Sequence, residues 1–393
     1  MFDFKYYAPT EVIFGKDSLK SLDKLLQKNN VKNLLIHYGS DRIKKNGLLD
    51  YVLEVCKNNN INTYLLGGVL PNPRLDKVYE GIEIGKKNNI DFILAIGGGS
   101  IIDSSKAIAY GLANDFDVWE LYDRKKQATG ALPIGVILTI AAAGSEMSNS
   151  SVITRVDTGD KRGYNSDYSR PRFAIMNPEY TMTLPKYQTM AGLSDVMMHT
   201  MERYFTNNGN MDLTDEIAEG LLRAVKNAAY KLLEDPNDYD ARANVMWASS
   251  LAHNNLTGCG NDGGDWSTHL LEHEVSGMFD VTHGAGLTAL WPSWARYVYK
   301  NCLHRFVKFA KNVMGVNIAA SEEEIALLGI KKMEEFYNDI GMPTNLIELG
   351  LNPTEENLKE MARRCAIATG GKKGSAKVLY EIDMYNIYKN ASR

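Results

Sequence analysis

The first half of the chain alternates short apolar runs with segments of helical periodicity. The expected strands are residues 33–38, 61–66, 91–96 and 135–140, and the expected helices are residues 43–57, 74–88 and 100–113. Strands that alternate with helices of roughly 10–15 residues predict βαβ units and a parallel sheet. The apolar runs are continuous, which is typical of strands that are covered on both faces.

The pattern changes after Leu184-Pro185. Helical segments then dominate, at residues 213–233, 239–256, 267–278, 295–314, 321–340 and 354–368. We therefore expect an α/β domain at residues 1–185 and an all-helical domain at residues 186–393, which fits 393 residues at roughly 100–200 per domain. A cleft between two such domains is a frequent place for a small-molecule site.

Charge and cysteine content exclude several classes of function. A formal charge of −4 offers no basic field for nucleic acid. The 4 cysteines lie far apart without a CxxC pair, which argues against disulfides and a thiolate zinc site. The start lacks a signal-peptide pattern, and the most apolar stretch, residues 132–144, is shorter than the roughly 20 residues of a membrane span. We expect a soluble, cytoplasmic protein with no nucleic-acid or membrane partner.

A glycine-rich turn follows the third expected strand. Gly97, Gly98 and Gly99 permit a tight turn and a close approach to a ligand. Ser100 then opens a helix, whose free N–H groups favour an anion such as a pyrophosphate. A purely structural turn fits as well, because Ser100 and Asp103 resemble a helix N-cap with an acidic N3 residue and GGGS differs from GxGxxG. Both interpretations stay open.

Two further segments suit a nucleotide. Asp41 can accept hydrogen bonds from a ribose 2′-hydroxyl, whereas Arg42 can pair with a 2′-phosphate, so this segment does not choose between NAD and NADP. A capped helix start with a solvated basic face explains the same residues. The small residues at 139–146 suit a flat cofactor ring or, equally, close packing of a strand against a helix.

Histidine spacing in the second half favours a metal site. Asp195 and His199 are four residues apart, as are His269 and His273, and this spacing places side chains on one face of a helix. His283 follows beyond a turn-like segment. One carboxylate with two or three imidazoles matches a mononuclear divalent site with an open position. Each pair alone is more often structural, so the hypothesis depends on their combination.

The HLLEH segment permits a different enzyme. His269, Glu272 and His273 resemble the inverted HxxEH motif of metallohydrolases rather than HExxH. A peptidase, however, does not need the preceding α/β half with its glycine-rich turn. A third hypothesis is a non-catalytic nucleotide-binding regulator, which does not need the carboxylate and histidines.

Taken together, these segments resemble the iron-containing (group III) alcohol dehydrogenase family, in the branch of bacterial butanol dehydrogenases and NADPH-dependent aldehyde reductases. The shared motifs run along nearly the whole chain: PTEVIFG, YG with IKKNG, PNPR, GGGSIID, AAGSEM, TLP, AGLSDVMMHTMERYF and GGDWSTHLLEHEVSGMFDVTHGAGL. The resemblance implies an α/β dinucleotide-binding domain and a helical metal-binding domain, in the dehydroquinate synthase-like architecture. It also implies reversible hydride transfer between NAD(P)(H) and a primary alcohol or aldehyde. A polyol dehydrogenase acting on a diol or glycerol is a related alternative.

The resemblance assigns roles to individual residues. The implied metal ligands are Asp195, His199, His269 and His283, and His273 is implied as a proton relay near the nicotinamide. The implied cofactor residues are Gly39, Ser40, Asp41, Arg42, Asn72, Gly97, Gly98, Gly99, Ser100, Asp103, Thr139, Ser145, Lys161, Thr183 and Leu184. The family implies Fe²⁺ and a homodimer, while the ligand types suit Zn²⁺ as well.

The chain departs from the family pattern at two places. The NADP-preferring branch often has YGGGS where this chain has YGSDR, so Asp41 would repel the 2′-phosphate that Arg42 could hold. The resemblance to the branch favours NADP(H) over NAD(H). Asn177-Pro178 replaces the usual Asp-Pro, and we expect no catalytic consequence from this change.

Overall fold

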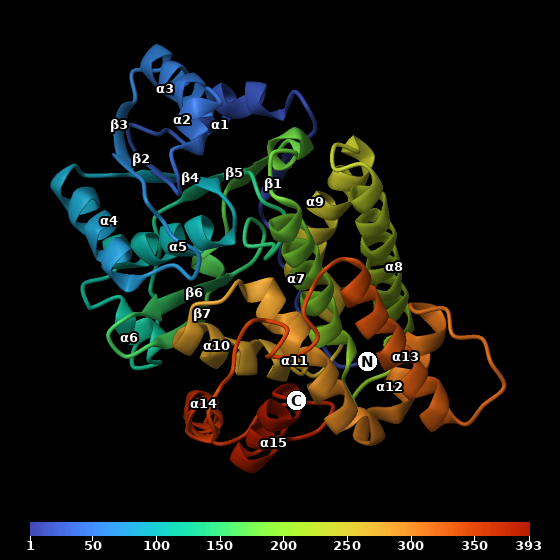
Figure 1. Ribbon diagram of the computed structural model, residues 1–393. Helices are drawn as coiled ribbons and strands as arrows, with labels where there is room; N and C mark the ends of the chain where they lie inside the picture. Colours follow the sequence, from blue (N-terminus) through green and yellow to red (C-terminus); the bar gives the residue numbers. More distant parts are fainter. The chain divides into compact units, whose positions relative to one another are not determined.

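The computed structural model describes residues 1–393 (Figure 1). The chain divides into two compact units, an α/β unit at Tyr7–Thr183 and a helical unit at Leu184–Arg393 that also includes Met1–Tyr6. The division at 183/184 falls beside the expected one at 185/186. The first six residues differ from the expectation, because the Phe2 amide donates a hydrogen bond to the Gly260 carbonyl at 2.9 Å within the helical unit.

A six-stranded parallel sheet forms the centre of the α/β unit, as the sequence predicted. The strand order is β1-β8-β5-β4-β2-β3. The strands are β1 (Glu11–Phe14), β2 (Asn33–Tyr38), β3 (Asn62–Leu66), β4 (Phe92–Gly97), β5 (Ile134–Leu138) and β8 (Phe173–Met176). Strands β1 and β8 were not expected. A separate antiparallel hairpin, β6 (Ser150–Arg155) and β7 (Asp160–Asn165), was not expected either.

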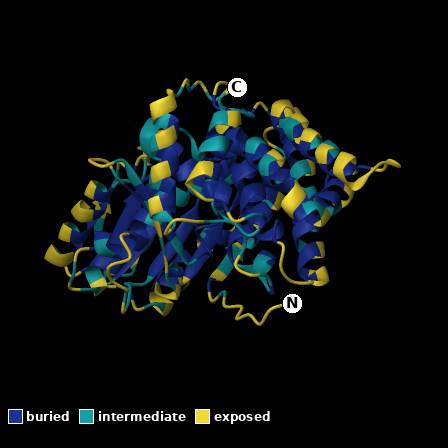
Figure 2. Cartoon of the chain, turned by 90° about the horizontal axis from the view of Figure 1, so that it is seen from below, coloured by how far each residue is buried: buried dark blue, intermediate teal, exposed yellow.

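Both faces of the sheet are buried (Figure 2). Leu34 and Leu94 pack in one core with apolar side chains of helices α1 (Leu22–Lys28) and α3 (Leu48–Asn58). The intervening residues Leu35 and Ile93 point to the opposite face and are fully buried too. This burial on both sides is the physical reason for the continuous apolar runs in the sequence.

The three predicted helices of the α/β unit are present, one of them in two pieces, and two further helices, the first and the last of this unit, were not expected. The helices of the unit are α1 (Leu22–Lys28), α2 (Arg42–Lys45), α3 (Leu48–Asn58), α4 (Leu75–Lys87), α5 (Gly99–Ala113) and α6 (Trp119–Tyr122). The single helix expected at residues 43–57 is broken into α2 and α3 by Gly47, whose φ is 76°. A positive φ is accessible to glycine and ends the first helix at this point.

The second unit is helical, as expected. Its helices are α7 (Lys186–Tyr204), α8 (Asp212–Glu234), α9 (Tyr239–His253), α10 (Ser267–Phe279), α11 (His283–Val298), α12 (Leu303–Asn312), α13 (Glu322–Asp339), α14 (Glu355–Ala368) and α15 (Glu381–Ala391). Short 3₁₀ turns occur at Ser18–Ser21, Asp167–Ser169, Pro178–Thr181, Leu256–Gly258 and Tyr299–Cys302. The expected helix at residues 295–314 is wrong, because the last of these turns separates α11 from α12. Helix α15 was not expected.

Helix α7 is central to the helical unit. It packs against α8, α9 and α11, and nearly all of its residues from Thr189 to Tyr204 are buried. Polar side chains on such a helix need partners inside the protein.

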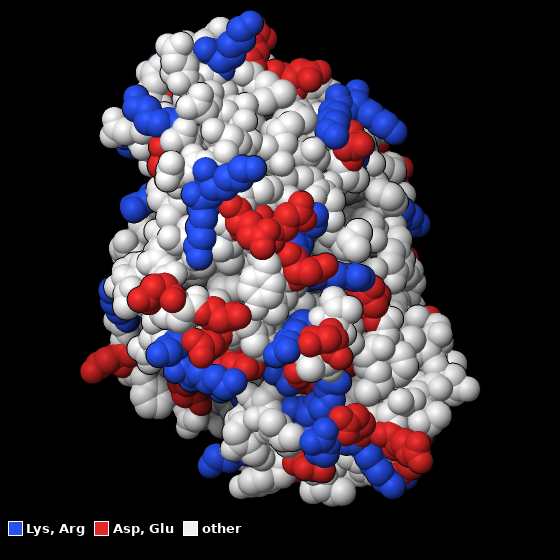
Figure 3. Space-filling view, turned by 90° about the vertical axis from the view of Figure 1, so that its left-hand side faces the viewer, with Lys and Arg blue, Asp and Glu red and all other residues white.

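The helices and one face of the surface each show a further feature. None of its helices combines the length and apolar character required to cross a lipid bilayer. On the face drawn in Figure 3, basic and acidic side chains are interspersed rather than segregated. That face therefore has no patch of one sign that would attract a polyanion.

Candidate active site

Helix α7 places a carboxylate and an imidazole side by side. Asp195 and His199 lie one turn apart, and the Nδ1 atom of His199 is 3.0 Å from both Oδ1 and the carbonyl oxygen of Asp195. Asp195 is 4 % exposed and His199 is 5 % exposed. The pair is therefore withdrawn from water, where a charged carboxylate requires a counter-charge.

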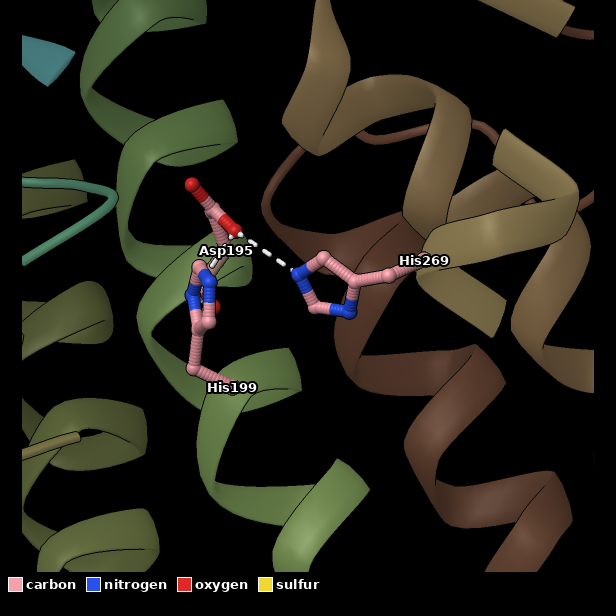
Figure 4. A group of neighbouring side chains, drawn as sticks. All are labelled: Asp195, His199 and His269. Carbon is pink, nitrogen blue, oxygen red and sulfur yellow. Dashed lines mark hydrogen bonds and ion pairs between the residues drawn. The ribbon is translucent and has the colours of Figure 1, made fainter. Parts of the chain in front are cut away.

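Two histidines from other helices approach the same carboxylate oxygen. The Nε2 atom of His269, in α10, lies 3.6 Å from Oδ1 of Asp195 (Figure 4). The Nε2 atom of His283, the first residue of α11, lies 3.8 Å from the same oxygen. The ligand atoms of Asp195, His199 and His269 all lie within 4.8 Å of one another. The structure thus brings the four predicted ligands together, although they come from distant parts of the chain.

A glycine permits the close packing of α11 on α7. A Cβ atom added to Gly284 would lie 2.0 Å from the carbonyl oxygen of Ala191 in α7. Real Cβ atoms do not come this close to a backbone oxygen, so position 284 has no room for a side chain. The neighbouring His283 therefore reaches Asp195 because residue 284 is glycine.

The group has the properties of a cation site. The Nε2 atom of His269 is buried and forms no hydrogen bond, and nitrogen atoms of three histidines lie 3.0, 3.6 and 3.8 Å from Oδ1 of Asp195. An unsatisfied buried polar atom costs about 1–3 kcal/mol, and coordination of a cation removes that cost. A carboxylate oxygen with imidazole nitrogens suits Fe²⁺ or Zn²⁺. These residues fit a divalent metal ion.

Burial and mutual attraction shift the pKa values of this group strongly. Burial would raise the pKa of Asp195, but His199, His269 and His283 hold it well below its usual value. Burial lowers the pKa of His199 to about 4. Burial would also lower the pKa of His269, but Asp195 and Glu202 raise it to about 9. Asp195 is therefore anionic at neutral pH, as a metal ligand must be.

His273 lies beside the cluster rather than within it. It follows His269 by one turn of α10, it is 9 % exposed, and its ring centre lies 6.0 Å from that of His283. This position, next to the four predicted ligands, is compatible with the predicted proton relay.

The HLLEH segment does not have the geometry of a hydrolase motif. Glu272 accepts a hydrogen bond from Ser276 at one carboxylate oxygen, and its other oxygen bonds to Nδ1 of His283. A general base must be free to take a proton from water. The structure therefore gives no support to the metallohydrolase alternative.

Two polar residues near the cluster were missed by sequence reasoning. The Oε1 atom of Glu202 lies 3.0 Å from Nδ1 of His269 and accepts the His269 backbone N–H at 2.8 Å. Arg203 donates to the carbonyl oxygen of His199 at 2.8 Å, and its guanidinium lies over the Trp266 ring. Glu202 had a usable signal, because it extends the face of Asp195 and His199 by one further turn of α7.

The predicted nucleotide residues gather at the carboxyl end of the sheet. Gly97 ends β4 and Gly99 begins α5, while Gly39 directly follows the neighbouring strand β2. A Cβ atom on Gly97 or Gly98 would lie 2.2 Å from Ile101 or 2.8 Å from Ile140, so neither position has room for one. The carboxyl edge of parallel strands, with a helix N-terminus, is where α/β proteins bind dinucleotides.

The predicted structural role of Ser100 is wrong. Gly98 is the N-cap of α5, and Ser100 lies within the helix. Asp103 instead accepts hydrogen bonds from the Ser145 hydroxyl at 2.6 Å and from the Val152 amide at 2.9 Å. Asp103 therefore holds the segment between β5 and β6 against α5.

The other predicted cofactor residues of the α/β unit lie in connected segments. Thr139 donates its amide to the Gly97 carbonyl at 3.0 Å. The turn that contains Asn72 bonds to β6 through Thr154, and Thr154 is paired with Lys161 of β7. Arg42 donates to the Thr183 hydroxyl. Leu184 begins the helical unit.

A buried lysine that sequence reasoning missed supports this region. Lys106 of α5 is fully buried, and its ammonium donates to the carbonyl oxygens of Ser145, Ser148 and Ser150 at 2.8, 3.0 and 2.7 Å. Burial lowers the pKa of this lysine to about 8. A lone lysine in an apolar helix gives no sequence signal of such a role.

The opposite charges of Asp41 and Arg42, which follow β2, have different partners within the α/β unit. The Asp41 carboxylate forms an ion pair with Lys44 at 2.7 Å. Arg42 bonds to the Thr183 hydroxyl and to the Tyr180 carbonyl, both of which are neutral groups. The negative charge is thus paired within the segment, whereas the contacts of Arg42 leave its positive charge unneutralised.

A parallel α/β unit with a glycine turn and a helical unit with a carboxylate–histidine cluster define the class of metal-dependent dehydrogenases. The family model "Iron-containing alcohol dehydrogenase" matches residues 9–178, and that of the family's C-terminal part matches residues 189–392. The chain belongs to the iron-containing alcohol dehydrogenase family, which confirms the predicted family and fold. It is an alcohol/aldehyde oxidoreductase of the iron type.

Individual relatives of the chain support this placement. The chain is 42 % identical to "NADH-dependent butanol dehydrogenase A" of Clostridium acetobutylicum over 100 % of both chains. It is 33 % identical to "NADPH-dependent aldehyde reductase YqhD" of Escherichia coli over 90 % of both. The crystal structure of a butanol dehydrogenase A from Thermotoga maritima is similar with a TM-score of 0.96 and 35 % identity, covering 100 % of this chain and 99 % of that one.

Proposed function

We propose that this protein interconverts a short primary alcohol and its aldehyde by reversible hydride transfer with NADP(H), using one divalent cation, Fe²⁺ or Zn²⁺. The ligands would be Asp195, His199, His269 and His283. The observation that carries this proposal is the approach of His269 and His283 to the buried Oδ1 atom of Asp195, at 3.6 and 3.8 Å. The names of the similar butanol dehydrogenase and aldehyde reductase support the substrate class.

In this proposal the two units contribute different parts of the chemistry. When bound, the divalent cation supplies Lewis acidity toward the substrate oxygen. Asp195 contributes the one negative charge of the ligand set, so that a dipositive ion keeps part of its charge. His273 accepts the hydroxyl proton during alcohol oxidation and returns it during aldehyde reduction. Asp195, His199 and His269 are buried, so their side of the site excludes most water, whereas the His283 side chain is 26 % exposed.

The α/β unit binds the dinucleotide in this proposal. Helix α5 is long, with 15 residues, and it begins at the carboxyl end of β4. The N–H groups of Gly99 and Ser100 precede the first hydrogen-bonded N–H of this helix, that of Ile101 to the Gly98 carbonyl at 3.1 Å, and they would face the pyrophosphate. The segment fixed by Asp103 and Lys106 shapes the adjacent surface for the cofactor ring.

The preference for NADP(H) is supported by charge. Asp41, Arg42, Lys44 and Lys45 together carry two net positive charges, and Asp41 is already paired with Lys44. A 2′-phosphate is therefore attracted to this segment despite the carboxylate. Against this stands the name of the butanol dehydrogenase A from Clostridium acetobutylicum, which is NADH-dependent. The coenzyme is thus tested separately from the reaction.

The reaction is tested on protein of known metal content. Removal of metal with a chelator should abolish oxidation of 1-butanol and reduction of butyraldehyde, and Fe²⁺ or Zn²⁺ should restore both. Full activity in a verified metal-free sample would contradict the role of the cation. Comparing 1-butanol with 1,3-propanediol in the same assay decides between the monohydric and the polyol substrate class.

The coenzyme is tested by comparing kcat/KM for NADPH and NADH with butyraldehyde. We expect the larger value for NADPH, and we expect Arg42→Ala to reduce the value for NADPH only. A larger value for NADH would reject the coenzyme preference and leave the reaction class intact.

We also propose a cytoplasmic homodimer, whose mass in sedimentation equilibrium should be twice that of the 43.8 kDa chain.

A further inference from the structure

Two buried glutamates contact the histidines of the proposed metal centre. The Oε1 atom of Glu202 lies 3.0 Å from Nδ1 of His269, and Oε2 of Glu272 bonds to Nδ1 of His283. Glu202 is 2 % exposed and Glu272 is not exposed. A buried carboxylate is costly, so the repeated pairing of carboxylate and histidine requires a physical explanation.

The ring geometry supplies that explanation. A neutral imidazole carries its proton on one nitrogen and a lone pair on the other. A carboxylate is only a hydrogen-bond acceptor, so the proton of each ring must lie on Nδ1, the nitrogen that faces the glutamate. A histidine that binds a metal ion must be neutral. In that neutral ring the lone pair is on Nε2, which is the atom that lies 3.6 Å (His269) or 3.8 Å (His283) from Oδ1 of Asp195.

Glu202 also fixes the helix that carries its histidine. Its Oε1 atom accepts the backbone N–H of His269 at 2.8 Å, in the first turn of α10. This oxygen therefore satisfies a helix N-terminal N–H from the neighbouring helix α7. Because ring and backbone of His269 share one acceptor, the ring orientation is coupled to the position of α10 on α7.

A glycine on α11 leaves room for the Glu272 side chain. A Cβ atom added to Gly286 of α11 would lie 2.8 Å from Oε1 of Glu272 and 2.9 Å from its Cγ atom. The same oxygen accepts a hydrogen bond from Ser276. Both oxygens of Glu272 are thus held between α10 and α11. Glu202 and Glu272 lie outside the cluster of Asp195, His199 and His269.

We propose that Glu202 and Glu272 are positioning residues that hold His269 and His283 in the Nδ1-protonated tautomer and thereby set the affinity of the site for a divalent cation. This inference rests on the metal centre of the proposed function. Carboxylates in this position also increase the basicity of the ligating nitrogen, and their loss typically weakens metal binding about 10–100-fold.

The first test measures the dissociation constant of Zn²⁺ by competition with a chelator, on the full chain. Glu202→Gln and Glu272→Gln should each weaken binding about 10–100-fold. The matched control is Glu274→Gln, because Glu274 is a buried glutamate of the same helix α10 but pairs with Arg364 at 3.0 Å rather than with a histidine. The control should bind Zn²⁺ as tightly as the unchanged protein.

A second test does not depend on the folding of any variant. In the Zn²⁺-loaded unchanged protein with ¹⁵N-labelled histidine, NMR should show His269 and His283 protonated at Nδ1 and coordinated through Nε2. The opposite tautomer for both rings would overturn the inference, as would wild-type affinity in both glutamine variants or an equal loss of affinity in the control. If the unchanged chain bound neither Zn²⁺ nor Fe²⁺, the metal centre of the proposed function would fail together with this inference.

Discussion

Two buried histidines of this protein differ in whether both ring nitrogens form hydrogen bonds. This difference distinguishes a histidine with a structural role from one that can bind a ligand. His37 of β2 is fully buried, with Nδ1 2.9 Å from the Leu66 carbonyl and Nε2 2.9 Å from the Ser104 hydroxyl. His269 is also buried, being 5 % exposed, but its Nε2 atom forms no hydrogen bond and lies 3.6 Å from Oδ1 of Asp195. Both nitrogens of His37 are therefore satisfied within the chain, whereas Nε2 of His269 can coordinate a bound ligand.

His37 provides a test of pH dependence. Burial lowers its pKa to about 4, compared with 6.5 for a free histidine. Because the folded-state pKa is depressed, the stability due to the neutral ring is fully present above pH 6.5 and is lost as the pH falls through 4. Urea unfolding should show that the protein loses about 3 kcal/mol more between pH 7.5 and pH 4 than His37→Gln does. Parallel pH dependence in the two proteins would contradict the role of His37.

The candidate ligands could be predicted because part of their geometry is local. A spacing of four residues places Asp195 and His199 on one face of any helix, whatever surrounds that helix. The contact of Glu272 with His283 depends instead on the packing of α11 against α10, which spacing alone does not specify. Glu202 is an intermediate case. The spacing predicts its position on the same face of α7 as Asp195 and His199, but it does not predict its contact with His269 of α10.

At the scale of elements, the strands of the six-stranded sheet that could be predicted are the longer ones: β2, β3, β4 and β5 have five or six residues. β1 and β8 have only four residues each and were missed, although β8 is fully buried. β2, β4 and β5 are long apolar runs inside the sheet. β1 has only four residues and lies at the edge of the sheet, with both end residues exposed, so its pattern is weak. The break between α11 and α12 was missed because the apolar pattern continues through the turn at Tyr299–Cys302.

Close helix packing gives a prediction with an internal control. Gly284→Ala should destabilise the protein by about 1–3 kcal/mol and reduce bound metal, because its Cβ atom would lie 2.0 Å from the Ala191 carbonyl of α7. Gly220→Ala in α8 should stabilise by up to about 1 kcal/mol, because the nearest atom would be 3.9 Å away. Thermal unfolding and metal analysis of both variants check this, and equal stability of the two would contradict the proposed contact.

The lysine that connects α5 to the segment after β5 gives another prediction. Lys106→Met should leave the buried oxygens of Ser145, Ser148 and Ser150 without their donor, at a cost of about 1–3 kcal/mol. The segment should become mobile, which should weaken NADPH binding in calorimetry and leave the Zn²⁺ affinity unchanged. Unchanged affinity for NADPH would show that the segment does not shape the cofactor site.

At the scale of the whole molecule, the proposed function divides the chemistry between two units. The proposed metal ligands all lie in the helical unit, and nearly all predicted nucleotide residues lie in the α/β unit. Each unit has its own core, so binding of the cation and binding of the dinucleotide should be separable by mutation. Hydride transfer, by contrast, requires both ligands at once.

This division leads to a prediction that separates the roles of two neighbouring histidines of α10. His269→Ala removes the Nε2 atom that faces Asp195, so it should lose bound metal, as plasma emission analysis can measure, and still bind NADPH. His273 is the proposed proton relay and not a proposed ligand, so His273→Ala should keep both ligands while turnover falls about 10²–10⁴-fold. Equal loss of metal in both variants would mean that His273 is a ligand and that the proton relay must be sought elsewhere. If turnover survived in the metal-free His269→Ala protein, the division itself would be wrong, because catalysis would then need only the unit that holds the dinucleotide.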